Sequence, residues 1–311
     1  MIIPYRSVPE LIKYGVIALD KPPGPTSHQV AAWIKRILEI DKVGHGGTLD
    51  PGVSGVLVIG LNNSLRVMHI SLREVKEYVG IMHLHRRVDE DVLRKTMAEF
   101  VGEIYQIPPM RSAVKRRLRK RRVYSLEIIE VDGRDVLFKA RVEAGVYIRA
   151  LCHDIGEALG VGANMQELRR TASGVFSEKD CVTLHELLDS YIFWKEYGEE
   201  EGIRRAIKPL EVMLRDFPKI VIKDSAVDAI CHGADLMAPG VLEVDGRVES
   251  GRTVVLSTRR GEAVAIARAL MGAKDMASST HGVVADVERV IMDRGTYPKM
   301  WKSGDRQPEI I

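Results

Sequence analysis

One acidic side chain stands in the most glycine-rich stretch of the chain. Five of the twelve residues from Gly44 to Gly55 are glycine, and Asp50 lies among them. Glycine has no side chain to obstruct a planar ligand, so a ligand can approach the backbone closely beside the carboxylate. His45 supplies a nearby donor or stacking surface. A turn residue before Pro51 is the alternative interpretation of Asp50. The pattern favours a ligand site built around one carboxylate.

Two common glycine-rich sites do not fit this stretch. No Gly-Lys-Ser/Thr follows the glycines, so the lysine that contacts phosphates in a P-loop is missing. The spacing also departs from Gly-x-Gly-x-x-Gly, and no regular alternation of strands and helices surrounds it. We therefore expect neither a nucleotide hydrolase nor a dinucleotide-binding enzyme.

Two other clusters of reactive residues are weaker candidates. His83 and His85 could face the same way on a strand, but no third metal ligand accompanies them at a convincing spacing. The consecutive residues Cys152, His153 and Asp154 point in different directions on a helix, so they cannot align as nucleophile, base and orienting acid. We expect no metal and no hydrolytic triad.

A dense basic segment is the second candidate for function. Between Ile104 and Leu126 there are eight basic residues and no acidic ones, and without those eight the net charge of +3 becomes −5. Like charges this close repel one another unless something neutralises them, and RNA phosphate is the expected neutraliser. A solvated surface loop is the alternative. The eight residues are Arg111, Lys115, Arg116, Arg117, Arg119, Lys120, Arg121 and Arg122.

Composition limits the class of protein. The 311 residues are 45% hydrophobic and 29% charged, which is typical of a globular chain and not of a disordered or collagen-like one. No apolar run reaches the roughly 18 residues of a spanning helix, so no membrane is expected. The three cysteines are far apart, which supports neither disulfides nor a zinc site. Because no secretory signal is recognisable, we expect a cytoplasmic protein.

The elements that must position Asp50 form a mixed α+β pattern. Apolar runs predict strands over 15–20, 56–59, 77–84, 123–131 and 136–142, with a further short strand over 146–149. Helical spacing predicts helices over 28–40, capped by Thr26 or Ser27, and over 89–101, 150–159 and 184–195. The prolines and glycine of 22–25 predict a rigid loop.

Beyond residue 217 the pattern changes to short β-rich runs separated by glycines. Strands are predicted over 220–222, 241–244, 253–257, 263–267 and 283–290. We therefore predict an N-terminal extension over 1–12, a first domain over 13–210, a small β domain over 217–293 and a poorly ordered tail over 294–311.

Five ordered motifs together resemble the TruB family of RNA pseudouridine synthases. They are residues 20–27, 44–51, 76–78, 145–149 and 168–170. Residues 110–117, 152–156 and 165–168 are most similar to the archaeal dyskerin-type members. The second domain resembles a PUA domain through 238–241, Gly251 and 264–266, with Arg252 and Ala267 departing from the usual Asp and Gly. The resemblance implies a mainly antiparallel sheet in the synthase domain and a small β-barrel-like PUA domain.

The resemblance also implies an isomerisation without a cofactor, in which uracil leaves its ribose, turns and rejoins through carbon 5. Asp50 would be the catalytic carboxylate, acting either by attack on the sugar or by another route. Arg149 would be its buried, bidentate partner. Removing one of the two would leave the other charge buried without a partner, at a cost of about 3–5 kcal/mol. Tyr78 would stack on the extruded base and help remove the carbon 5 proton, and core packing is its alternative role.

RNA contacts follow from the same resemblance. The uridine must leave its stack, and His45 and Leu168 are candidate wedges or walls for it. Lys21 would either contact the RNA backbone or support the catalytic loop. The basic segment over 111–122 would be a mobile loop that closes over substrate RNA.

Dyskerin-type enzymes are implied to work in an H/ACA ribonucleoprotein. A guide RNA selects uridines in ribosomal RNA, and small Nop-type and Gar-type proteins assist. Some archaeal members also modify the TΨC loop of transfer RNA without a guide. A non-catalytic H/ACA scaffold is the competing hypothesis, which intact Asp50, Tyr78 and Arg149 disfavour.

Overall fold

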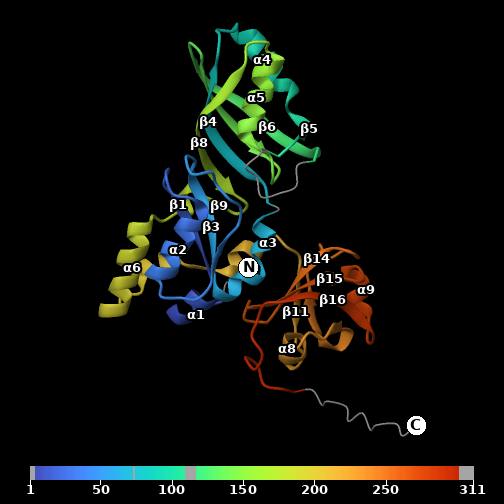
Figure 1. Cartoon of the computed structure of the whole chain (residues 1–311). Coiled ribbons are helices and arrows are strands. Elements are labelled where there is room, and N and C mark those ends of the chain that lie inside the picture. The colour runs from blue at the N-terminus through green and yellow to red at the C-terminus, as the bar shows by residue number, and fades with distance from the viewer. Residues whose placement is uncertain (1–3, 73, 109–116, 301–311) are drawn as a thin grey trace, which may run out of the picture. The chain divides into compact units, whose positions relative to one another are not determined.

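The computed structural model describes residues 4–72, 74–108 and 117–300, and its contacts divide the chain into two compact units (Figure 1). The larger unit is Gly15–Lys208, and the smaller unit combines residues 1–14 with residues 209–311. The predicted tail beyond residue 300 and the basic residues Arg111, Lys115 and Arg116 lie outside the described residues. No helix in the described ranges is long and apolar enough to cross a membrane.

A mainly antiparallel sheet forms the larger unit. Its strands run in the order β1-β3-β8-β4-β7-β6-β5, with β2 pairing to β3 and β9 to β8. The exception is the parallel contact of β3 with β8, where Gly55 lies opposite Arg170. Their bounds are β1 Gly15–Lys21, β2 Val43–His45, β3 Ser54–Leu61, β4 Lys76–Leu84, β5 Gly102–Gln106, β6 Arg119–Asp132, β7 Asp135–Val142, β8 Ala163–Ser173 and β9 Phe176–Ser177.

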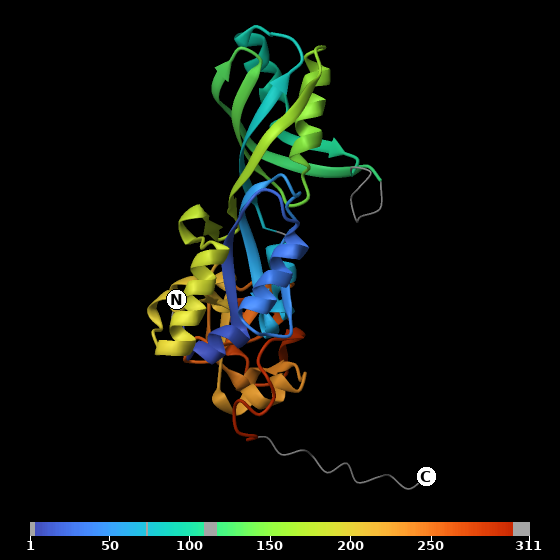
Figure 2. The same ribbon diagram turned by 60° about the vertical axis from the view of Figure 1, so that its left-hand side comes forward.

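Helices cover parts of this sheet. The helix α5 packs along β8, as Figure 2 shows, by burying Leu151, Cys152 and Ile155. The helix α2 begins after Thr26, whose side chain accepts from Gln29 N in a capping box, which confirms one of the two predicted caps. The helices are α2 Ser27–Ile37, α3 Met68–Ser71, α4 Glu90–Glu99, α5 Ile148–Ala158, α6 Leu184–Tyr197 and α7 Glu201–Ala206.

Three sequence predictions in the larger unit were wrong or incomplete. The strand predicted over 146–149 does not form, because Tyr147 caps α5 and Ile148 and Arg149 are already helical. Residues 119–122, expected within a mobile loop, pair with β5 as the start of β6. The central strand β8 was not predicted at all, since polar and charged residues dominate its sequence.

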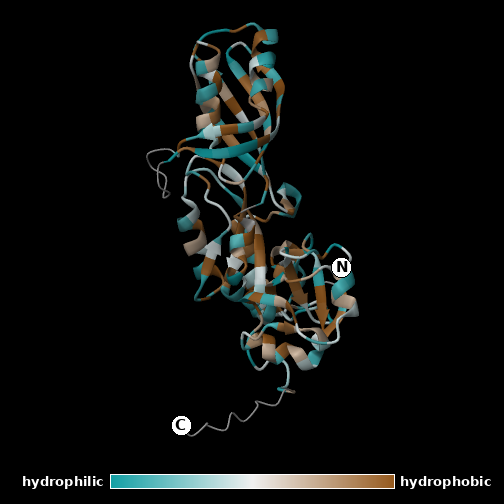
Figure 3. Ribbon diagram, turned by 90° about the vertical axis from the view of Figure 1, so that its right-hand side faces the viewer, coloured by the Kyte–Doolittle hydropathy of each residue, from teal (hydrophilic) through white to brown (hydrophobic). Residues whose placement is uncertain are grey.

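The smaller unit is a barrel-like sheet, as predicted, with strands in the order β12-β16-β15-β14-β11-β13. Its strands are mostly hydrophobic (Figure 3), and they pack with α8 around Ile220, Leu256 and Val264. The elements are α1 Val8–Tyr14, β11 Lys219–Ile222, α8 Asp224–Cys231, β12 Leu236–Met237, β13 Val241–Val244, β14 Thr253–Ser257, β15 Ala263–Ala269, α9 Ala273–Ser278 and β16 Val283–Val290. The two-residue strand β10, Lys208–Pro209, lies where the chain passes from the larger unit to the smaller one.

The N-terminal segment belongs to this smaller unit. Arg6 and Glu211 form an ion pair at 2.6 Å, and both side chains are buried. The same Glu211 oxygen accepts from the backbone N of Ala263 at 3.0 Å. A buried pair is costly to break on one side, so this contact ties the segment before α1 to β15.

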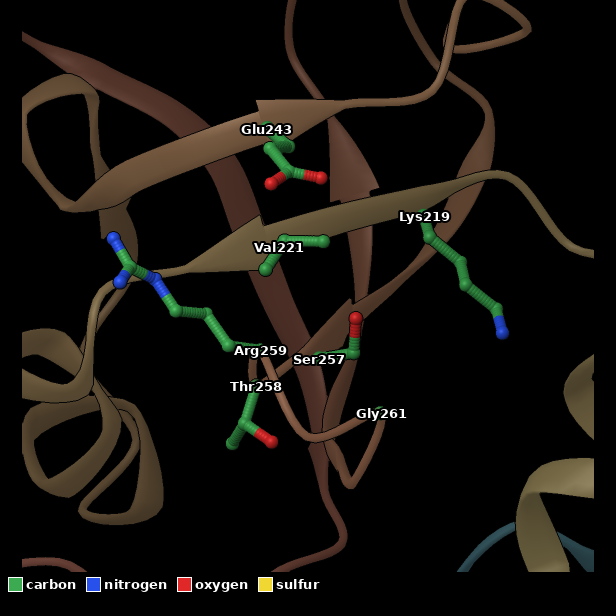
Figure 4. A pocket seen from close by; sticks show the side chains of 7 residues that line it. All are labelled: Lys219, Val221, Glu243, Ser257, Thr258, Arg259 and Gly261. Carbon is green, nitrogen blue, oxygen red and sulfur yellow. The ribbon is translucent and has the colours of Figure 1, made fainter. Parts of the chain in front are cut away.

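A pocket of mixed charge opens beside β11 and the β14–β15 turn. Figure 4 shows Glu243 on one side of the pocket and Arg259 and Lys219 on others. Burial is the main cause that lowers the pKa of Lys219, against the opposing charge of Glu211. The lining residues are Lys219, Val221, Glu243, Ser257, Thr258, Arg259 and Gly261.

Candidate active site

Asp50 lies on the loop between β2 and β3, and its neighbours are firmly anchored. Leu49 is buried, and its backbone N and O both bond to the Ser27 hydroxyl, at 2.9 and 3.1 Å. The Pro51 carbonyl accepts from Gly24 N at 2.8 Å, and Val53 N donates to Asp50 O at 3.0 Å. The Asp50 side chain is nevertheless 52% exposed. A fixed backbone therefore presents an accessible carboxylate.

Lys21 supports this loop from inside the protein. Lys21 is fully buried. Its Nζ donates to the carbonyls of Pro22 at 2.8 Å, Pro51 at 3.2 Å and Val53 at 2.8 Å. An ammonium group has three donors, so none remains for a phosphate. Burial lowers the pKa of Lys21, with Arg170 adding to the shift and Asp50 opposing it. Of the two roles that the sequence left open for Lys21, this geometry favours support of the loop over an RNA contact.

Arg149 meets Asp50 from the first turn of α5. Its Nη2 lies 2.7 Å from Asp50 Oδ2, so the two predicted partners are in contact. The expectation of a buried, bidentate pair is wrong, because a single nitrogen bonds and the side chains are 57% and 52% exposed. The pair joins a surface loop to a helix end, where water reaches both groups, so the cost of about 3–5 kcal/mol for a buried pair does not apply.

The exposure of this pair leads to a prediction about Arg149→Ala. We expect unfolding free energy to change by less than about 1 kcal/mol, while turnover falls about 10²-fold to 10³-fold through loss of a charged donor. Urea denaturation and single-turnover assays measure the two quantities. Arg94→Ala is the matched control, since it breaks a similarly exposed pair with Glu90 on α4. A loss of several kcal/mol, or normal turnover, would contradict the assignment.

Arg170 on β8 is a second support that the sequence analysis did not assign. It is 1% exposed, and it donates from Nε to Val56 O at 2.7 Å and from Nη2 to Gly47 O at 3.1 Å. These carbonyls stand on either side of Asp50 in the chain. Gly55 has φ +99°, and an added Cβ there would lie 2.2 Å from Arg170 O. Only glycine fits this close approach. The motif at 168–170 singled out this region, but without a predicted β8 nothing in the sequence placed Arg170 beside the loop.

The predicted base-contacting residues lie on neighbouring strands. Tyr78 on β4 is opposite Arg170 on β8 and is 8% exposed. Leu168 is also buried, against Gly80, where an added Cβ would lie 2.8 Å from its Cδ1. Core packing therefore accounts for part of the environment of both side chains, and their roles toward a base stay predictions.

His45 lies at the edge of β2, and its ring is partly buried. The ring meets His28 edge-on at 4.9 Å, and its buried Nδ1 finds no hydrogen-bond partner among the described residues. Burial is the main cause that lowers the pKa of His45, and the charges of His28 and Arg170 add to it. A neutral imidazole is thus favoured at this position, which suits a stacking or wall role.

Lys76 is another buried cation near the loop. Its Nζ donates to the Ser173 hydroxyl at 2.7 Å, and its Cε would lie 3.9 Å from a Cβ at Gly47. Burial, aided by Arg170 and opposed by Glu74, lowers the pKa of Lys76 to about 8.

This pKa shift gives a pH prediction. Between pH 8 and 10.5 the unfolded chain keeps the Lys76 proton that the folded chain has lost, so this group makes stability rise with pH. We expect the unfolding free energy of the wild type, relative to Lys76→Met, to increase as the pH is raised above 8. Urea titrations of both proteins at several pH values measure the two unfolding free energies. Subtracting one from the other removes the contributions of the titratable groups that both proteins share. A difference that stays flat or falls would contradict the assignment.

Comparison with known proteins decides the family. A model of the TruB family pseudouridylate synthase N-terminal domain matches residues 35–148, and one of the tRNA pseudouridylate synthase B C-terminal domain matches 149–215. Models of the PUA and DKCLD (NUC011) domains match 218–291 and 4–31. The chain is 55% identical over 300 residues to the probable tRNA pseudouridine synthase B of Methanocaldococcus jannaschii, which covers 96% of this chain and 89% of that protein. The chain belongs to the TruB family of pseudouridine synthases.

Further relatives of this synthase are equally similar. The probable tRNA pseudouridine synthase B of Pyrococcus abyssi is 57% identical over 291 residues, covering 93% of this chain and 87% of its own. A solved Cbf5-Nop10-Gar1 complex matches with TM-score 0.87 and 55% identity over 94% of this chain and 90% of that chain. An H/ACA RNP bound to a substrate RNA containing 2'-deoxyuridine matches with TM-score 0.88 and 50% identity, over 96% and 93%. The synthase is an isomerase, and the resemblance predicted from its motifs is confirmed.

The basic segment of the synthase is partly neutralised by the protein itself. Lys120 on β6 pairs with Glu103 on β5 at 2.7 Å, and Arg121 lies 3.8 Å from Glu143. Arg117 and Arg122 are exposed, whereas Arg119 and Arg121 are half-buried along β6. Acidic side chains of the protein thus neutralise part of this charge, and the paired strands present the other basic residues on an ordered surface.

The weaker candidates lack the geometry for chemistry. His83 Nδ1 lies 2.5 Å from Asp135, and His85 Nε2 lies 3.1 Å from Asn164. No group of three or more His, Cys, Asp or Glu side chains that could hold a metal occurs in the described part of the chain. Burial raises the pKa of Cys152 to about 12, so its thiol stays protonated and inert.

Proposed function

We propose that the synthase converts uridine to pseudouridine in the TΨC loop of transfer RNA and, with an H/ACA guide RNA and small Nop-type and Gar-type proteins, in ribosomal RNA. The names of its relatives and the contents of the matching complexes support these substrates and partners. A cytoplasmic location and the domain limits 13–210 and 217–293 belong to the same proposal. The observation that carries it is the exposed contact between Arg149 on α5 and Asp50 on a loop that Lys21 and Arg170 hold through hydrogen bonds to its carbonyls.

Asp50 acts as the catalytic carboxylate of this reaction. The bond between N1 of uracil and C1' of ribose breaks, and a new bond forms between C5 and C1'. The C5 proton leaves and N1 gains a proton, so the isomerisation needs no oxidant and no cofactor. Asp50 either attacks the sugar or stabilises its positive charge, and both routes require the ionised carboxylate. Arg149, a permanent cation, orients that carboxylate.

Tyr78 and the loop walls act on the extruded base. Tyr78 removes the C5 proton through its hydroxyl, and its ring packs against the uracil plane. The neutral His45 ring and Leu168 form walls of the base site. Extrusion costs a few kcal/mol, which stacking and phosphate contacts offset.

The test uses two reactions with the purified full-length protein. The first contains a transfer RNA transcript alone, and the second contains a ribosomal RNA fragment with guide RNA and the Nop-type and Gar-type proteins. Pseudouridine mapping at single-nucleotide resolution should find product in both. Product in neither reaction, with RNA still bound, would favour the non-catalytic scaffold.

Salt dependence tests the basic segment. Each phosphate contact contributes about 0.7–0.9 to the slope of log binding constant against log salt. Replacing four basic residues by glutamine is expected to flatten the slope for substrate RNA by up to about 3, measured by filter binding. The four are Arg117, Arg119, Lys120 and Arg122, and the control quartet is Lys35, Lys195, Arg204 and Arg205 on α2, α6 and α7. An unchanged slope, or an equal change in the control, would refute the phosphate contacts.

A further inference from the structure

A buried glutamine fixes the start of the helix that carries Arg149. Gln106, the last residue of β5, is 4% exposed. Its Oε1 accepts from Tyr147 N at 3.0 Å, and its Nε2 donates to Tyr147 O at 3.2 Å. The side-chain amide therefore satisfies both backbone groups of one residue, as a neighbouring strand would. Tyr147 is the N-cap of α5, two residues before Arg149.

This contact adds to the packing of Ile148 and Leu151, which are buried in the first turn of α5. The side chain of Tyr147 does not itself cap the helix. Tyr147 O also accepts from Leu151 N at 3.0 Å, so the first turn of α5 and Gln106 share one carbonyl. The Arg149 side chain is 57% exposed, so packing does not confine it. Its position opposite Asp50 therefore follows the backbone at the start of α5.

We propose that Gln106 is a positioning residue for pseudouridine formation, which holds the N-cap of α5 so that Arg149 meets Asp50. This inference rests on the proposed roles of Asp50 and Arg149. The chain of contacts runs from Gln106 through the Tyr147 backbone to Arg149 Nη2 and then 2.7 Å to Asp50 Oδ2. A shift of about 1 Å in a catalytic group can cost about 100-fold in rate.

Three variants separate positioning from simple structural support. Gln106→Ala removes both bonds, and we expect kcat to fall about 10-fold to 100-fold with KM for transfer RNA nearly unchanged. Gln106→Glu keeps the acceptor for Tyr147 N but places an anion against Tyr147 O. Protonation of the glutamate carboxyl restores a donor to Tyr147 O. The activity of Gln106→Glu relative to wild type should therefore rise as the pH is lowered. Gln166→Ala, at an exposed position of β8, is the control and should match wild type.

A double-mutant cycle gives the decisive result. If Gln106 acts through Arg149, Gln106→Ala should lower kcat in the wild type but add almost nothing in an Arg149→Ala background. Additive losses, or a KM effect alone, would overturn the inference even if the wild type makes pseudouridine. Failure of the proposed function is distinguishable, because wild type would then make no product. Melting temperatures of all variants identify any that are unfolded, and Gln106→Glu then supplies the test.

Discussion

Replacing Asp50 by asparagine is expected to abolish pseudouridine formation while leaving RNA binding intact. The substitution keeps the size of the side chain but removes the charge that both catalytic routes require. A loss of at least about 10³-fold, or about 4 kcal/mol of transition-state stabilisation, is expected in single-turnover assays. Stability should change by less than about 1 kcal/mol, because the pair with Arg149 is exposed. Filter binding with substrate RNA measures the ground-state affinity.

The control for this experiment is Asp41→Asn, at an exposed acidic position before β2. It removes the same charge from the same unit without touching the loop that carries Asp50. Near-normal turnover in Asp50→Asn would reject the catalytic assignment. Loss of activity together with loss of RNA binding would instead assign the carboxylate to substrate affinity.

Replacing Tyr78 by phenylalanine is expected to give the second largest effect. The buried ring remains on β4, which pairs with β7 and β8, but the hydroxyl proposed to take the C5 proton is gone. Loss of a general base lowers rates about 10²-fold to 10⁴-fold. Rapid-quench measurement of product should show that fall, while the RNA dissociation constant and the urea midpoint stay close to wild type.

Tyr124→Phe on β6 is the matched control, because its side chain is 46% exposed and it removes the same hydroxyl elsewhere in the sheet. Tyr78→Leu adds a second comparison by removing the ring. If Tyr78→Phe turns over normally and Tyr78→Leu unfolds, core packing is the role of Tyr78, and the base must be another group.

Much of the architecture could be predicted from local sequence. The predicted strand over 77–84 corresponds to β4, and 136–142 to β7, because a run of apolar residues marks each segment. In the structure, burial alternates along both strands. The sequence also predicted a cap of α2 at Thr26 or Ser27, and Thr26 is the cap. Every strand predicted beyond residue 217 is present. These features depend on residues close together in the chain, which is why pattern and capping chemistry were sufficient.

β8 shows where local pattern fails. A central strand is usually rich in apolar residues, but β8 carries Arg169 and Arg170 in its middle. Arg169 is held by Asp20 at 2.9 and 3.0 Å, and Arg170 by two loop carbonyls. Partners distant in sequence satisfy these charges, so no window along the chain could reveal that the strand tolerates them.

The sequence by itself determined the family, the α+β class, the acidic loop residue and its arginine partner, because those depend on residue types in ordered motifs. The tertiary structure alone decided that the Asp50–Arg149 pair is exposed and that Lys21 donates to loop carbonyls. It also decided that Arg170 bonds to a carbonyl of the Asp50 loop and that Gln106 bonds to the Tyr147 backbone. Burial and hydrogen-bond partners are properties of segments brought together from distant parts of the chain. They follow from how the strands and loops pack, and residue type does not encode them locally.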